Sequence, residues 1–252
     1  MEYMTPLSGT PYPQTIRRLR MAVLVISILF ALWNTSFMRG AIPISPVILL
    51  LSPLASWGIF WQPITAALTI PYGGLGIEMV FDLILLNFFL VPISSFVFAY
   101  LEHKRFIRFL SSLIAIGTAV FWGVNTCVTY ASPCSLFSSL ALSIIVFWFL
   151  LHRDGGSTIV IAIPISRWWI LFIACLIIFP APIFSHEWGK VLMAFSMALS
   201  SYLWGITSCR LRSHISQLAS FERWLDKTYH SLIRLFQWYI ARPVRQLFLR
   251  KR

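Results

Sequence analysis

The stretch 184–201, FSHEWGKVLMAFSMALSS, places a histidine just before a long apolar run. The run continues to about residue 209, and a helix needs about 20 apolar residues to cross the hydrocarbon core of a bilayer. His186 therefore lies at the end of an expected membrane span. A titratable ring in that position indicates either an ordinary interfacial side chain or a functional site.

The whole chain has the composition of a multi-pass membrane protein. Of its 252 residues, 58% are hydrophobic and 11% are charged, whereas soluble domains carry about 25% charged residues. Its mean hydropathy is +0.80. We expect an all-α fold: a polytopic bundle of six helices with a polar N-terminal segment at 1–20 and a basic tail at 210–252. The apolar runs predict spans at about 21–38, 76–101, 106–128, 132–151, 163–182 and 188–209.

The distribution of basic residues predicts the orientation. With the N-terminus inside, all of the 20 Lys and Arg residues except Arg39 and Lys190 fall on the inner side of this topology. Cytoplasmic loops of membrane proteins are enriched in Lys and Arg. We therefore expect an integral membrane protein with both termini in the cytoplasm, in the plasma or inner membrane if the source is bacterial.

A serine lies at the outer end of another predicted span. Ser132 belongs to the stretch 130–140, YASPCSLFSSL, and on the predicted topology it shares a face with His186. Serine at a helix start is often an N-cap. A hydroxyl and an imidazole at one membrane depth also suit a serine nucleophile activated by a general base. We expect apolar helices to enclose the imidazole, which favours its neutral, proton-accepting form. Ser135 is a second candidate nucleophile.

From about residue 48 to 210 the chain resembles the rhomboid family of intramembrane serine proteases and their inactive relatives. Trp61, Gln62 and Thr65 lie where the family has a Trp-Arg pair and a threonine. The resemblance implies that Ser132 is the nucleophile, His186 the base and Gly189 a close-packing glycine. It further implies cleavage of membrane-protein substrates near the outer face. We expect no cofactor and no metal, since none of the four cysteines has metal-ligand spacing with a histidine. The stretches that carry it are LLLSPLASWGIFWQPITAAL (49–68), YLEHKRF (100–106), YASPCSLFSSL (130–140) and SHEWG (185–189).

The chain departs from the family pattern at the oxyanion donors. The family places a His and an Asn on the second span, whereas GIEMVFDLILLN (76–87) has Glu78 and Asp82 nearest those positions. An ionised carboxylate accepts hydrogen bonds and repels an oxyanion. Four interpretations of these carboxyl groups are open. Either one carboxyl group is protonated, or Asn87 is the donor after a shifted alignment, or the oxyanion hole is defective, or both carboxylates simply face water. Tyr130 and Pro133 also replace the glycines that flank the serine in the family motif.

The tail from residue 210 predicts a basic amphipathic helix. Such helices bind anionic lipid surfaces, and we expect this partner rather than nucleic acid. The sequence leaves three functions open. The chain is an active protease, an inactive rhomboid-like protein that binds membrane clients, or a small transporter component in which Glu78, Asp82 and His186 line an ion path. It does not fix the substrate or the oligomeric state.

Overall fold

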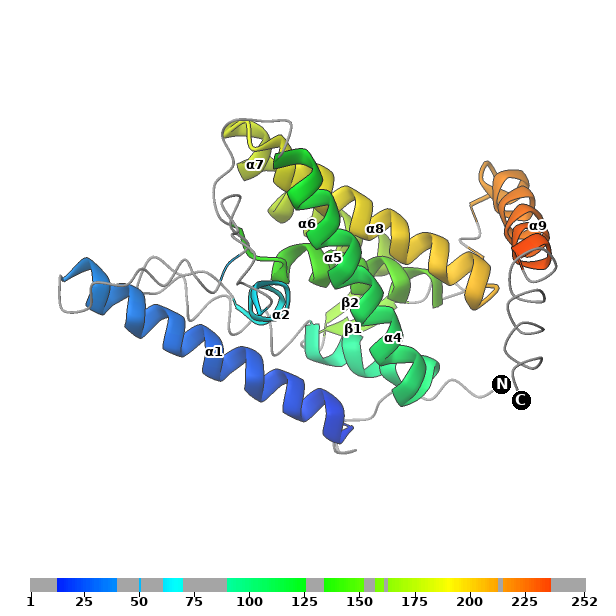
Figure 1. The fold of residues 1–252 in the computed structure, drawn as a ribbon. Coiled ribbons are helices and arrows are strands. Elements are labelled where there is room, and N and C mark those ends of the chain that lie inside the picture. Colours follow the sequence, from blue (N-terminus) through cyan, green and yellow to red (C-terminus); the bar gives the residue numbers. More distant parts are fainter. Residues whose placement is uncertain are drawn as a thin grey trace, which may run out of the picture.

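The computed structural model describes residues 13–39, 50, 61–69, 90–125, 134–151, 157–160, 163–212 and 215–236. These parts of the chain are predominantly helical, as predicted (Figure 1). The structure also contains two short strands that were not predicted. They are β1 (Ser157–Val160) and β2 (Ile163–Ser166), and they pair in antiparallel orientation. The helices are α1 (Gln14–Met38), α2 (Gln62–Leu68), α4 (Val91–Asn125), α5 (Phe137–Leu151), α6 (Arg167–Ile178), α7 (Pro180–Phe184), α8 (Trp188–Ser208) and α9 (Ala219–Phe236).

Two of the described helices have the length and composition of membrane spans. They cover Val91–Val124 and Trp188–Cys209, and both are long and apolar enough to cross a bilayer. The helices α1, α5 and α6 overlap further predicted spans at 21–38, 132–151 and 163–182. The count of six spans stays a prediction.

The structure places some helix boundaries differently from the sequence prediction. Helix α1 begins at Gln14, inside the segment 1–20. The run 163–182 is not one helix, because it begins as strand β2 and is interrupted before Pro180. The β-branched residues of 157–165 favour extended backbone. Proline has no N–H group and fits the first turn of a new helix, which is where Pro180 lies in α7.

Helix α4 is divided at Glu102, whose backbone has φ 62° and ψ 169°. The two parts, 91–101 and 103–125, meet where the sequence predicted one span to end and the next to begin. An L-residue in this region of backbone space is strained, because it is occupied almost only by glycine. The exposed basic residues Lys104, Arg105 and Arg108 follow directly after the break.

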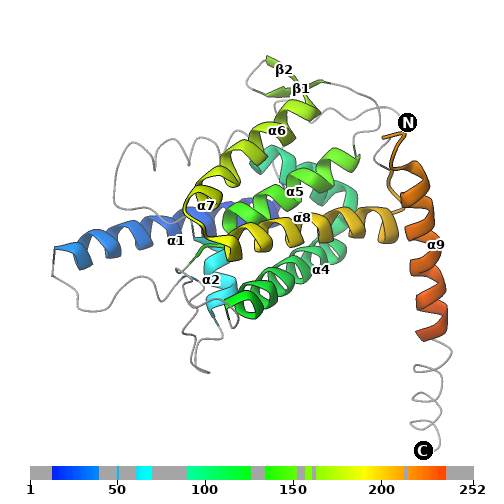
Figure 2. The ribbon, with the colours of Figure 1, turned by 90° about the horizontal axis from the view of Figure 1, so that it is seen from above.

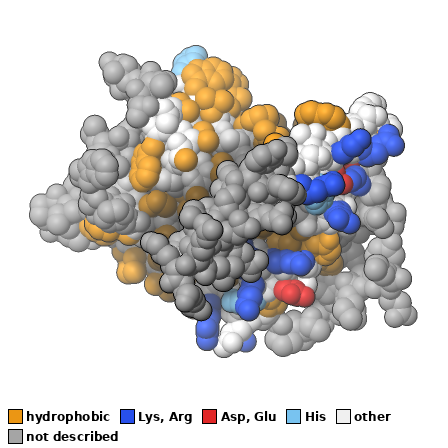
Figure 3. Space-filling model, turned by 45° about the vertical axis from the view of Figure 1, so that its right-hand side comes forward, with side chains coloured by type: hydrophobic (Ala, Val, Ile, Leu, Met, Phe, Trp, Pro, Cys, Tyr) orange, Lys and Arg blue, Asp and Glu red, His pale blue; other side chains and the backbone are white. Residues whose placement is uncertain are grey.

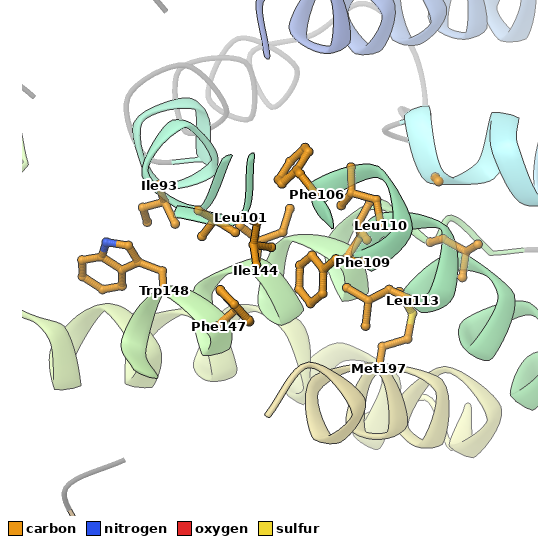
Figure 4. Close-up of a cluster of buried hydrophobic side chains, with 14 of the residues drawn as sticks. Ile93, Leu101, Phe106, Phe109, Leu110, Leu113, Ile144, Phe147, Trp148 and Met197 are labelled. Atoms are coloured by element: carbon orange, nitrogen blue, oxygen red, sulfur yellow. The ribbon is translucent and has the colours of Figure 1, made fainter. Parts of the chain in front are cut away.

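The core lies between α5, α8 and both parts of α4. Helices α5 and α8 run in the same direction, since Ser143 pairs with Ser201 and Leu150 packs near Gly205. The second part of α4 runs opposite to both. The Phe109 and Phe147 rings are 4.9 Å apart between their centroids. Aliphatic and aromatic side chains fill the space between the helices (Figure 4).

The basic segments and the turn with His186 lie at opposite ends of the bundle. One end holds the start of α1, the break in α4, the end of α8 and helix α9 (Figures 1 and 2). The opposite end holds the end of α1 and the turn between α7 and α8. His186 lies in that turn, which separates it by the length of α8 from the basic segments.

Candidate functional site

The turn that carries His186 has the hydrogen bonds of a Schellman motif at the end of α7. The Glu187 N–H donates to the Pro182 carbonyl at 2.8 Å, and the His186 N–H donates to the Ile183 carbonyl at 3.2 Å. In this motif the first residue after the helix cap, which donates the shorter-range of the two bonds, takes the left-handed conformation that glycine favours. His186 occupies that place with φ 56°. A histidine is thus held where the backbone favours glycine, and such outliers are enriched at functional sites.

The His186 side chain is exposed. The expectation that apolar helices enclose it is therefore wrong. The physical reason is the turn itself: the left-handed residue reverses the chain between α7 and α8, so His186 precedes the packed face of α8 and is not part of it.

A polar network surrounds the start of α8 next to His186. Glu187 precedes the first residue of α8 and accepts hydrogen bonds from Lys190 Nζ at 2.9 Å and from Ser185 Oγ at 3.2 Å. A carboxylate at a helix N-terminus also interacts favourably with the helix dipole. Glu187 was not among the residues predicted for the site, although the Glu-x-x-Lys spacing is a known signal for a pair on one helix face.

The start of α5 is attached to the end of α2. The Leu136 N–H donates to the Ala66 carbonyl at 2.9 Å. The Ser135 hydroxyl shares its proton between the carbonyls of Ala66, at 3.0 Å, and Thr69, and accepts a hydrogen bond from the Phe137 N–H at 3.0 Å. Because this hydroxyl both donates and accepts hydrogen bonds within the fold, Ser135 has a structural role here.

The start of α5 lies beside the middle of α8 and not beside its first residue. Leu136, directly before α5, and Met197, in the third turn of α8, both approach Gly117 of α4. Cys134, two residues before Leu136, is a buried free thiol. The start of α5 therefore packs with the end of α2, with α4 and with α8.

Several predicted site residues lie outside the described residues. These are Ser132 and the candidates for the oxyanion hole or cavity, Glu78, Asp82 and Asn87. The Ser132–His186 pair, and any contribution from the second predicted span, therefore stay predictions. Gly189 is half-buried in the first turn of α8, and its close-packing role is likewise untested.

The other features of the described parts offer less chemistry. An apolar crevice between α1, α2, α4 and α5 is lined almost entirely by carbon, including Val23, Leu68, Phe137 and Ile144. It lies away from His186. Within the described residues, no group of three or more His, Cys, Asp or Glu side chains is placed to hold a metal ion.

Comparison of the chain with protein-family models, with curated proteins and with solved structures found no match.

Proposed function

We propose that this chain is a rhomboid-like intramembrane serine protease in which Ser132 is the nucleophile and His186 is the general base. One observation carries the proposal. Leu136, four residues after Ser132 in the sequence, and Met197 of α8, the helix that follows His186, both approach Gly117 of α4. The chain segments that follow the two members of the proposed pair therefore pack together, although 54 positions separate Ser132 from His186 in the sequence.

The proposed chemistry is acyl transfer followed by hydrolysis. Ser132 Oγ attacks the carbonyl carbon of a substrate peptide bond while a His186 ring nitrogen takes the hydroxyl proton. His186 then gives this proton to the leaving amine, and an acyl-serine ester remains. Water, deprotonated by His186, attacks the ester, releases the carboxylic acid and restores the serine hydroxyl. The exposure of the imidazole supports access of water from the outer face.

The proposal includes a membrane topology with six spans and both termini inside. Apolar side chains are exposed along the outer sides of three helices, which favours contact with lipid over contact with water. The basic segments at the opposite end from His186 support the orientation. The exposed apolar residues are Met21, Val25, Leu29 and Leu32 of α1; Trp168, Trp169, Phe172, Ile173, Leu176 and Ile177 of α6; and Leu192, Phe195 and Leu199 of α8.

A fluorophosphonate probe, which reacts with activated serines, tests the proposal directly. We expect the reconstituted protein to be labelled at Ser132 and to cleave a single-span reporter with a weakly helical outer segment. Ser132→Ala and His186→Ala should each abolish labelling and cleavage, while circular dichroism and thermal unfolding stay close to those of the parent protein. Labelling that survives both substitutions would disprove the proposed pair.

One structural observation favours a second candidate function, that of an inactive rhomboid-like protein that binds membrane clients. Backbone N–H groups at a helix start can stabilise an oxyanion. Here the Leu136 N–H is bonded to Ala66 and the Phe137 N–H to Ser135. If the folded protein shows neither labelling nor cleavage, and a single-span membrane protein co-purifies with it, this second function is the correct one.

A further inference from the structure

Helix α9 is fixed crosswise at the basic end of the bundle. Figures 1 and 2 both show it lying across the end of α8. The Tyr202 hydroxyl of α8 donates a hydrogen bond to Glu222 Oε1 at 2.6 Å, and Arg212 lies 2.8 Å from Asp226 Oδ2. Glu222 is only 1% exposed. These two contacts hold the first half of α9 against the end of α8.

The same contacts decide which charges α9 presents to its surroundings. Glu222 and Asp226 are the acidic residues of the α9 sequence, and both are directed to the bundle. The basic residues Arg223, Lys227 and Arg234 are exposed. The outward surface of α9 is therefore positively charged.

An apolar face accompanies this basic face. Phe221, Trp224 and Leu232 are 47%, 61% and 59% exposed. Their spacing of three and eight residues places them on one side of a helix with 3.6 residues per turn. The rings of Phe221 and Trp224 are stacked, with centroids 6.0 Å apart. Within the described residues, this face carries large apolar groups that the bundle does not cover.

The basic surface extends beyond α9. Lys and Arg side chains gather at the end of the molecule that holds α9 (Figure 3). They come from segments that are far apart in sequence, and the exposed ones are Arg17 and Arg18 of α1, Lys104, Arg105 and Arg108 after the break in α4, and Arg210 after α8. The positive-inside rule places such a cluster next to the cytoplasmic leaflet.

We propose that α9 lies in the interface of this leaflet and binds its anionic phospholipids. Phe221, Trp224 and Leu232 insert at the level of the upper acyl chains, and the basic face neutralises headgroup charge. A basic amphipathic helix with aromatic residues on its apolar face binds in this way. Charge complementarity selects an anionic lipid surface as the occupant, because α9 directs its acidic side chains to the bundle. The inference requires a membrane-embedded chain, and it does not depend on the chemistry of Ser132 and His186.

Photo-crosslinking in defined bilayers tests which surface covers the apolar face. The full chain is reconstituted in phosphatidylglycerol or phosphatidylcholine nanodiscs with benzoyl-phenylalanine at position 224 or at position 223. These neighbours lie on different faces of α9, so the second variant is the matched control. We expect acyl-chain adducts from position 224 and not from position 223. Crosslinks from position 224 to a second copy or to another protein would overturn the proposal.

Hydrogen exchange tests the role of charge. We expect the amides of α9 to exchange at least about tenfold more slowly in phosphatidylglycerol than in phosphatidylcholine, since each basic residue near an anionic surface adds to the attraction. The triple substitution Arg223→Gln, Lys227→Gln and Arg234→Gln should remove most of this difference. Equal exchange of the parent protein in the two lipids would refute binding of anionic lipid, whatever the activity of the protein.

Discussion

Replacing His186 with glycine separates the chemical role of the imidazole from the conformation of its backbone. His186 has φ 56° in the turn between α7 and α8. Arg210 has φ 55° in the turn after α8, where the Leu211 N–H donates to the Gly205 carbonyl, six residues earlier, at 2.9 Å. Arg210→Gly is therefore a control, because it also replaces a left-handed residue after a helix, at the end opposite the proposed site.

The expected gain in stability follows from this geometry. An L-residue in the left-handed region costs about 1–2 kcal/mol, and a glycine at that place removes the cost. Glycine also loses more conformational freedom on folding, which lowers the stability of the variant by about 0.4–1 kcal/mol. Each glycine variant should therefore be more stable than the parent by about 0.5–1 kcal/mol. His186→Ala keeps the backbone cost and should be less stable than His186→Gly by about 1 kcal/mol.

Thermal unfolding in a mild detergent, followed by intrinsic fluorescence, measures these differences. In a soluble chain of this size, 1 kcal/mol corresponds to a change of about 2–4 °C in Tm. Fluorophosphonate labelling is measured on the same samples. We expect His186→Gly to raise the Tm and to abolish labelling, and Arg210→Gly to raise the Tm and to leave labelling intact.

Two results would contradict the reasoning. If His186→Gly lowers the Tm below that of His186→Ala while Arg210→Gly raises it, His186 does not occupy the left-handed turn position. If His186→Gly is labelled as strongly as the parent protein, the imidazole is not the general base. The first result would refute the local structure, and the second would refute the proposed chemistry.

Three further substitutions test the packing around the site and the tail. Gly117→Ala places a Cβ against Met197 Sδ and 3.0 Å from Leu136 Cδ2 and should cost about 1–3 kcal/mol, whereas Gly123→Ala meets nothing within 4 Å; equal Tm values for the two variants would argue against the close approach of α4, α5 and α8. Tyr202→Phe leaves the buried Glu222 carboxylate without its 2.6 Å hydrogen bond and should cost about 1–3 kcal/mol; limited proteolysis should then cut between α8 and α9 faster than in Tyr229→Phe, and an unchanged rate would refute the contact. Ser135→Ala should lower stability by about 1 kcal/mol, because it removes the hydrogen bonds of the Ser135 hydroxyl to the Ala66 and Thr69 carbonyls, and should retain fluorophosphonate labelling; loss of labelling in a folded protein would identify Ser135 as the nucleophile.

The sequence was most informative where the signal is local. Hydrophobic runs identified helices at α1, α5 and α8, and the polar break after residue 101 marked the division of α4. It was less informative at 163–182, where β-branched residues and Pro180 divide an apolar run that hydropathy alone treats as one helix. Hydropathy measures the transfer of side chains to an apolar medium and does not register backbone preference.

The candidate site shows the same division. The sequence supplied the identity of His186 and its position before a span, but it did not predict that His186 would be exposed in a left-handed turn. The ion pair between Glu187 and Lys190 next to His186 was also not predicted. This pair depends on where α8 begins, and helix boundaries are the least certain part of a prediction from sequence.

The sequence by itself determined that the chain is helical and apolar and that its basic residues are concentrated in a few segments, because length, hydropathy and charge are properties of each segment alone. Only the tertiary structure decided that the start of α5 adjoins both α2 and α8, and that Glu222 and Asp226 are directed to the bundle. These relations join residues that are distant in the sequence. They depend on how helices fit together through side-chain shape and paired polar groups, which no single segment encodes.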